Sequence, residues 1–217
     1  MTLIKADNQP IDTRFGDATW LTDFITPNNP DVILKYQELT QGLTNTDDVF
    51  IALWEHVAVK PYVPLVAAKL MVGDKVLFQR DTWFFPAEAM KVGALNCANR
   101  AFLLTSLLKN HLRSPGDVYC IIGDLVLGDV GSHAWVEVRH QGRSYIMETT
   151  QPNIRYAMIP KELAGAYQAM VCFDEKSVYT VDRSVNIVEV LQADFALDPI
   201  KYLETYLCER CLEMEGA

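Results

Sequence analysis

Near residue 115, the apolar residues of this 217-residue chain change their spacing. Before that point they recur every three or four positions, as on the buried face of a helix, and we expect helices that begin near residues 30, 46, 86 and 97. After it, short apolar runs alternate with turns, which predicts strands at 118–122, 133–138, 145–150, 170–173 and 178–181. Helices followed by an antiparallel sheet indicate an α+β domain.

The composition bounds the class of protein. Half of the residues are hydrophobic, which suits a sizeable core, and the length predicts a single domain over 1–217. The formal net charge is −9, and no basic cluster is visible, so we expect no nucleic-acid partner. No run approaches the roughly 18 apolar residues of a membrane-spanning helix, so we expect no membrane partner. The oligomeric state is left open.

The five cysteines and the first residues point to a reducing compartment. The opening sequence MTLIKADNQP lacks the basic and apolar segments of a signal peptide. An odd number of cysteines without an export signal predicts reduced thiols. We therefore expect a cytoplasmic location.

Cys97 is the first candidate for chemistry. It follows the turn Gly93-Ala94-Leu95-Asn96 and opens a strongly apolar helix. The first turn of a helix carries unpaired N–H groups and a partial positive charge, and both favour a thiolate. The same N–H groups could hold the oxyanion of an acyl-transfer intermediate. The alternative is that a small residue packs beneath a helix start.

His133 and Glu148 are the second and third candidates. His133 opens the expected strand HAWVEV, and Glu148 lies in the next one, YIMETT. With a two-residue loop at Gln141-Gly142, His133 faces Thr150 and lies diagonal to Glu148, on one face of the sheet. Diagonal side chains meet when they are long. Glu148 could then hold the imidazole while the other ring nitrogen faces a thiol. The alternative is a polar histidine at a strand end.

These segments resemble the transglutaminase-like cysteine proteins of the papain-like superfamily, in particular the bacterial transglutaminase-like cysteine peptidases. The stretch PAEAMKVGALNCANRAFLLTSLLKN is similar to their nucleophile segment, GSHAWVEV to their histidine strand and METT to their acid-bearing strand end. The three segments come in the family order, with 36 residues from Cys97 to His133 and 15 from His133 to Glu148. The resemblance covers about 46–150, which we take as the core, between a helical part over 1–45 and strands and a helix over 151–217.

Two positions depart from the family pattern. Leu95-Asn96 stands where the family has Gly-Asp before the cysteine, and Glu148 replaces the usual Asp. Leu95 has less backbone freedom than glycine, whereas Asn96 can still cap the helix. The longer carboxylate of Glu148 needs a shifted backbone to do the same orienting job.

Other polar candidates are weaker. Cys120 and Cys172 lie within apolar strands and are expected in the core. Cys208 and Cys211 form a CxxC, but no second pair completes a zinc site. Asp124 and Asp129 do not have the ordered spacing of a calcium loop. We expect neither a metal nor a cofactor, and whether calcium binds is left open. For a second oxyanion donor, upstream of the nucleophile as in the family, Gln79 and Trp83 both remain candidates.

The resemblance implies a papain-like α+β core and a cysteine-dependent acyl-transfer enzyme. Cys97 would be the nucleophile, His133 the proton carrier and Glu148 the residue that orients His133. The expected substrate is a peptide, a protein or a small amide, with hydrolysis as the reaction. Two alternatives stay open: a transamidase that uses an amine acceptor, and an inactive binding or scaffold protein of the same fold.

Overall fold

The structure is a computed structural model that describes residues 3–182 apart from 9, 15–16, 65–66, 73–74, 82 and 128. The side chains of 11–18, 67–81 and 129 also lie outside the description. The helix expected at 198–211, with Cys208 and Cys211, falls outside the described residues.

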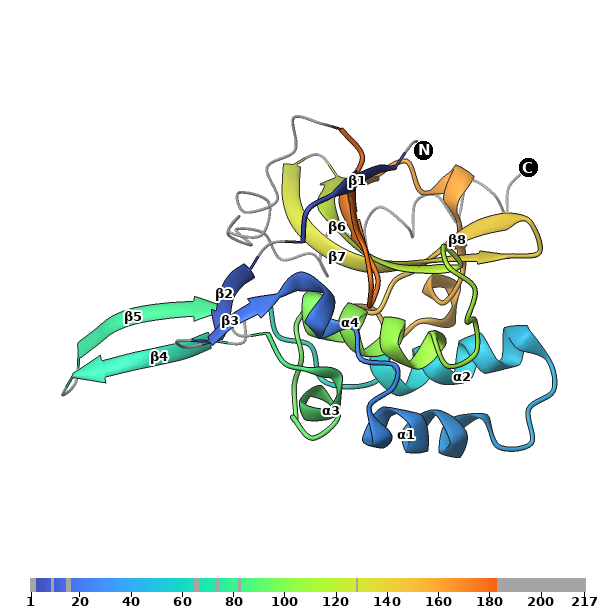
Figure 1. Ribbon diagram of the computed structural model, residues 1–217, viewed down its shortest axis with the longest axis horizontal. Helices are drawn as coiled ribbons and strands as arrows, with labels where there is room; N and C mark the ends of the chain where they lie inside the picture. Colours follow the sequence, from blue (N-terminus) through green and yellow to red (C-terminus); the bar gives the residue numbers. More distant parts are fainter. Residues whose placement is uncertain are drawn as a thin grey trace.

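Two layers make up the body of the molecule, with an antiparallel sheet above a group of helices (Figure 1). In the described part of the chain the sheet has seven strands, in the order β1-β11-β10-β6-β7-β8-β9. The strands are β1 (Ile4–Ala6), β6 (Val118–Leu127), β7 (Asp129–His140), β8 (Arg143–Met147), β9 (Ile159–Pro160), β10 (Tyr167–Phe173) and β11 (Val178–Thr180). The α-helices are α1 (Pro30–Thr40), α2 (Thr46–Ala58), α3 (Pro86–Ala89) and α4 (Cys97–Leu108). This confirms the predicted α+β class.

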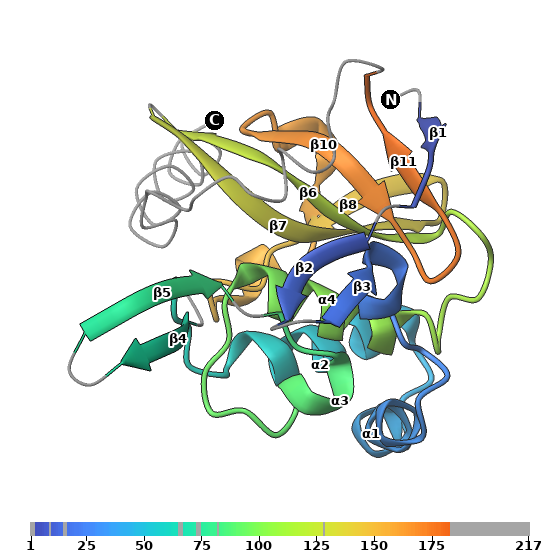
Figure 2. The same cartoon turned by 60° about the vertical axis from the view of Figure 1, so that its left-hand side comes forward.

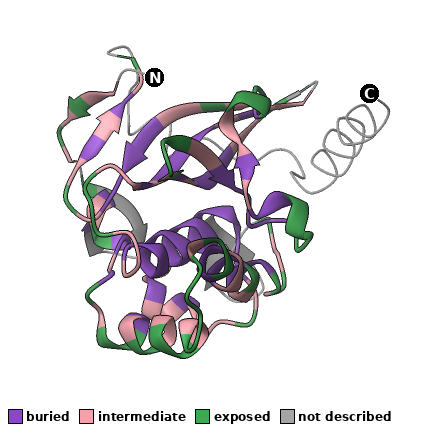
Figure 3. Ribbon diagram, turned by 90° about the vertical axis from the view of Figure 1, so that its right-hand side faces the viewer, coloured by how far each residue is buried: buried purple, intermediate pink, exposed green. Residues whose placement is uncertain are grey.

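Helix α4 lies between the sheet and the other helices (Figure 3). The sequence predicts one apolar stripe on this helix, but all of its residues are buried, including polar ones such as Asn99 and Arg100. Buried polar groups need hydrogen-bond partners. The Ser106 hydroxyl accepts a bond from the backbone N–H of Thr26 (3.0 Å), and the Asn99 side chain accepts one from the N–H of Phe84 (2.6 Å). These bonds attach two loops to the central helix.

The N-terminal part differs from the helical segment expected over 1–45. It contains α1, but it also contributes β1, which pairs with β11 at the edge of the main sheet. Two further strands, β2 (Pro10–Arg14) and β3 (Asp17–Trp20), pair with each other and lead into the short 3-10 helix η1 (Leu21–Phe24). Short strands with few apolar residues carry little periodicity, which is why the sequence does not reveal them.

A second hairpin extends away from the body of the molecule (Figures 1 and 2). It consists of β4 (Ala67–Val72) and β5 (Lys75–Asp81), which pair with each other. Residues 73–74, between these two strands, fall outside the described residues. Within the described part of the chain, none of the helices has the length and apolar character needed to cross a bilayer.

The hairpin β7–β8 has the register that the sequence predicts. His140 pairs with Arg143 across the two-residue turn Gln141-Gly142. Both turn residues have positive φ, 50° at Gln141 and 77° at Gly142, as a type I′ turn requires. The predicted end of the second strand is wrong: β8 ends at Met147, not at residue 150. The chain leaves the sheet there.

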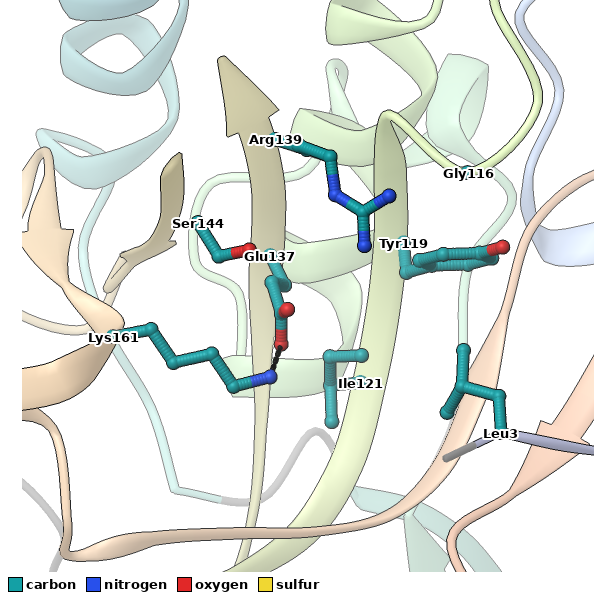
Figure 4. A pocket seen from close by; sticks show the side chains of 8 residues that line it. All are labelled: Leu3, Gly116, Tyr119, Ile121, Glu137, Arg139, Ser144 and Lys161. Atoms are coloured by element: carbon teal, nitrogen blue, oxygen red, sulfur yellow. Dashed lines mark hydrogen bonds and ion pairs between the residues drawn. The ribbon is translucent and has the colours of Figure 1, made fainter. Parts of the chain in front are cut away.

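The segment after β8 returns to the sheet through η2 (Ile154–Tyr156), β9 and η3 (Lys161–Leu163). The Lys161 ammonium group of η3 lies 2.5 Å from Oε2 of Glu137 on β7, and this ion pair ties the segment to the sheet. Figure 4 shows the pair at the edge of a cavity of about 130 Å³, together with Tyr119, Arg139 and Ser144. Polar side chains of this kind are ordinary on the open face of an antiparallel sheet.

Candidate active site

Cys97 is the first residue of α4. The Asn96 side chain caps the helix by accepting a hydrogen bond from the N–H of Asn99 (2.9 Å), as predicted. Leu95 is held by two backbone hydrogen bonds, one to Pro61 (3.0 Å) and one from Val63 (3.1 Å). Its φ is not positive, so this turn does not need the glycine found in the family. The structure therefore places Cys97 at a regular helix N-terminus.

His133 and Glu148 are in direct contact. Nε2 of His133 lies 2.7 Å from Oε2 of Glu148, and because an ionised carboxylate only accepts, the ring N–H is the donor. Both residues are 0% exposed. Glu148 reaches the ring although it lies beyond the last residue of β8. Its own N–H bonds to the carbonyl of Tyr156 (2.9 Å), which holds the backbone at this position.

The Glu148 carboxylate has a full set of donors. Oε1 accepts hydrogen bonds from the N–H and the hydroxyl of Thr150, both at 2.7 Å. Oε2 accepts one from the hydroxyl of Tyr167 (3.0 Å) in addition to the one from His133. The indole N–H of Trp54 holds the backbone by donating to the carbonyl of Glu148 (2.5 Å). These four donors hold the carboxylate in a single orientation. The carboxylate in turn fixes the orientation of the His133 ring.

The charges of the pair stabilise each other. Burial lowers the pKa of His133, but the charge of Glu148, its hydrogen bond and the interaction with Cys97 outweigh burial and raise it above its ordinary value. Burial raises the pKa of Glu148, but the charge and the hydrogen bonds of His133 and Thr150 outweigh it and bring it below its ordinary value. The arrangement therefore favours an imidazolium beside a carboxylate.

The second ring nitrogen of His133 remains for the thiol. Nδ1 is buried and makes no well-formed hydrogen bond within the described residues. Cys97 interacts with the same ring. Because Nε2 is occupied by Glu148, Nδ1 is the nitrogen available to the Cys97 thiol. Hydrogen bonds of this kind are often loose without substrate.

The structure thus brings together all three residues singled out in the sequence. Sequence reasoning missed the residues that hold Glu148 from other elements, namely Trp54 on α2 and Tyr167 on β10. An aromatic side chain with a polar tip is a weak signal by itself. The bond from Thr150 to Glu148 was easier to predict, because side chains of this kind often form hydrogen bonds with groups two residues away.

The structure also locates three of the weaker candidates. Cys120 and Cys172 are buried, as predicted, and burial raises the pKa of both thiols, that of Cys172 to about 12. Trp83 is buried, and its ring packs against Phe24 and Phe102, at 5.4 and 5.0 Å between centroids.

Two further predictions concern a second oxyanion donor and a metal site. Gln79 lies on β5, where side chains are outside the description, so the choice of a second oxyanion donor stays open. In the part of the chain that the structure describes, no group of three or more His, Cys, Asp or Glu residues is arranged to hold a metal ion.

The candidate site is closed. Cys97, like the other two residues, is 0% exposed. A substrate carbonyl needs to approach the thiol to about 3–3.5 Å before it can react. Chemistry at Cys97 therefore requires an opening motion.

Comparison with known proteins gives only distant similarities. No family model matches the chain, and no curated protein matches it. Among solved structures, Legionella pneumophila LapG has a TM-score of 0.41 and 13% identity, covering 69% of this chain and 87% of that one. Its calcium-bound form has a TM-score of 0.39 and 12% identity, with coverages of 73% and 96%. A candidate cysteine protease from Cytophaga hutchinsonii has a TM-score of 0.41 and 13% identity, covering 81% of this chain and 56% of that one.

Similarity at this level says nothing about activity. The helices and strands of the chain themselves define an α+β fold. The helix that begins at Cys97 packs on an antiparallel sheet, and a strand of this sheet carries His133.

Proposed function

We propose that the protein is a cysteine-dependent acyl-transfer enzyme that hydrolyses a peptide or another amide through Cys97, His133 and Glu148. The observation that carries the proposal is the enclosed His133–Glu148 hydrogen bond of 2.7 Å beside a cysteine at a helix N-terminus. A buried imidazole paired with a carboxylate has little structural use by itself, because two charges taken out of water are costly. The resemblance of the three ordered segments to transglutaminase-like proteins supports the same function.

Each residue has a defined step in this reaction. The Cys97 sulfur attacks the carbonyl carbon of the substrate, a C–S bond forms, and the carbonyl electrons move to oxygen. His133 gives its proton to the amide nitrogen, the C–N bond breaks, and an amine leaves. Water then attacks the thioester and loses a proton to His133, and the C–S bond breaks to release the acid. Glu148 orients the ring and stabilises its charged form.

The helix start supplies the oxyanion site. The N–H groups in the first turn of α4 have no partner within the helix, apart from that of Asn99, which bonds to the Asn96 side chain. Such groups can receive the negative oxygen of the tetrahedral intermediate.

The test is selective alkylation followed by acyl trapping. In a Cys208→Ser/Cys211→Ser background, iodoacetamide should label Cys97 and spare Cys120 and Cys172, whose pKa values burial raises. Peptide mapping by mass spectrometry identifies the labelled residue. Intact mass should then reveal a covalent acyl adduct with peptide thioester or amide probes in this protein and none in its Cys97→Ala variant. An adduct that survives Cys97→Ala would show that another residue is the nucleophile.

The inactive scaffold is the second candidate, and the complete burial of the site favours it. In that case Cys97 would react no faster than Cys120 and Cys172, and no acyl adduct would form. A transamidase would form the adduct and pass it to an added primary amine in preference to water, which the ratio of the two products measures.

A further inference from the structure

Arg100 is a buried cation one helical turn from Cys97. The two residues lie three positions apart on α4, so their side chains are neighbours on the helix surface. Arg100 is only 1% exposed, although arginine is rarely buried so fully without a partner for its charge. Its role is not explained by the reaction steps of Cys97, His133 and Glu148.

The guanidinium joins three segments of the chain. Nη1 donates to the carbonyl oxygen of Thr149 and, at 3.4 Å, to that of Ala58, while Nη2 donates to the carbonyl of Lys60. Ala58 is the last residue of α2, where carbonyl groups lack partners within the helix. Thr149 directly follows Glu148. Arg100 therefore fixes the backbone beside the acid against the end of α2 and the start of α4.

The charge of Arg100 acts on the same site. Its guanidinium also lies over the ring of Tyr62, 5.1 Å from the centroid. Burial lowers the pKa of Arg100 to about 10, and interactions with Tyr62, Glu148 and Cys97 act against this lowering. At neutral pH the group stays charged. Because such interactions are mutual, the charge of Arg100 favours the ionised form of Glu148.

An arginine that only caps α2 would also bond to Ala58 and Lys60. Two features go beyond capping: the bond to Thr149, next to the acid, and the balance of charge. When the proton of Cys97 is on His133, the site holds two negative charges, on Cys97 and Glu148, and the positive charges of His133 and Arg100 balance them. Without Arg100 the imidazolium alone would face both negative charges, which is costly in a buried site.

We propose that Arg100 is a positioning residue for this site, which holds the backbone beside Glu148 and adds a second positive charge, besides that of His133, next to Glu148 and Cys97. It rests on the proposed function, because it assigns Arg100 a part in the reactivity of Cys97. It predicts that the charge of Arg100, and not only its hydrogen bonds, sets the pH range in which Cys97 reacts.

The test is the pH dependence of Cys97 alkylation by iodoacetamide, in the Cys208→Ser/Cys211→Ser background. Arg100→Gln keeps a hydrogen-bond donor without the charge, and Arg100→Lys keeps the charge without the planar fork. Arg139→Met is the matched control, since it removes a cation from an exposed position of β7. Arg100→Met is a second neutral variant, which keeps part of the apolar stem; because removing one partner from a buried set of charges is destabilising, only folded variants are compared. Near-ultraviolet circular dichroism checks the fold of each.

We expect the neutral variants to react over a higher pH range. A displacement by one pH unit corresponds to a rate about tenfold lower on the acidic side of the profile. Arg100→Lys should keep the wild-type midpoint, and Arg139→Met should leave the whole profile unchanged. A folded neutral variant with the wild-type midpoint overturns the proposal, and so does an equal loss of rate at every pH in the Gln and Lys variants. If Cys97 of the wild-type protein does not react, the result contradicts the proposed function. If it reacts but its pH profile does not depend on the charge of Arg100, the result contradicts only the role proposed for Arg100.

Discussion

The hydroxyl of Tyr167 lies 3.0 Å from Oε2 of Glu148, the same oxygen that accepts the ring N–H of His133. Tyr167 begins β10, two strands away from β7, and its ring also packs edge-on against Trp135 (5.2 Å between centroids). Glu148 is thus held by a residue of β10 as well as by residues of its own loop.

Tyr167→Phe removes this bond and keeps the ring. A hydrogen bond to a charged group contributes about 1.5–3 kcal/mol, so we expect acyl-enzyme formation to slow by about tenfold or more. Single-turnover measurements with a thioester probe give the rate. Tyr145→Phe on β8 is the matched control and should be neutral. If Tyr167→Phe reacts at the wild-type rate, Thr150 and His133 are sufficient to orient the acid.

Glu148→Gln should lower the pKa of His133. In the native site the charge and hydrogen bond of Glu148 raise that pKa against the effect of burial, and an amide supplies no charge. An NMR titration of the His133 ring in protein with labelled histidine follows the change, with His56, His111 and His140 as internal references. A ring that titrates at the same pH in both proteins would contradict the pairing. Activity should fall partly with Gln and more with Ala.

The same pair makes stability depend on pH. The raised pKa of His133 contributes stability that is complete below its unfolded value of about 6.5 and is lost as the pH rises through the native value. The lowered pKa of Glu148 contributes stability that is complete above about 4.5 and is lost as the pH falls through its native value. We therefore compare the unfolding free energies of wild type and Glu148→Gln across the pH range. The balance should be most favourable to wild type between about pH 4.5 and 6.5. Urea unfolding across the pH range measures it.

Glu148→Asp introduces the acid that is usual in the family that the sequence resembles, on a backbone built for the longer side chain. The shorter side chain leaves a gap of about one methylene to His133, and small misplacements can cost around 100-fold in rate. We expect a loss of acyl-enzyme formation with a stable fold. Wild-type activity in this variant would mean that the loop after β8 adjusts freely, in spite of the Trp54 and Thr150 bonds.

Gly123 permits the close approach of β6 and β10. A Cβ at this position would lie 2.1 Å from the backbone oxygen of Gln168, so Gly123→Ala must push the strands apart. Overpacking typically costs about 1–3 kcal/mol, and we expect at least that loss in thermal or urea unfolding. Gly165→Ala, where the added carbon meets nothing within 4 Å, is the control and should change stability by less than about 0.5 kcal/mol. Equal stability of the two variants would contradict this strand contact.

Local patterns predicted that His133 and Glu148 lie near each other, although β8 ends one residue before Glu148. The even loop Gln141-Gly142 sets the register of β7 and β8, and the register sets which side chains share a face. The N-cap Asn96 and the start of α4 at Cys97 also follow from neighbouring residues alone.

Contacts between distant segments were not predictable in this way. Tyr167 reaches Glu148 because β10 pairs with β6 and shifts register between Ala169 and Val171, which no local pattern encodes. Arg100 looks like one polar residue in an apolar helix, and its burial depends on carbonyl groups at the end of α2. The pairing of β1 with β11 joins the two ends of the described chain.

The strand order has a consequence for the time at which the site becomes complete during synthesis. The residues that meet around Glu148 leave the ribosome in the order Cys97, His133, Glu148 and Tyr167, and the strand that carries the last of them, β10, lies between β6 and β11 in the finished sheet. A nascent chain that ends before residue 167 lacks both the hydroxyl that holds the acid and the strand that supports it. The proposed site is therefore complete only after β10 has been made, although its cysteine, histidine and acid are already present in the nascent chain.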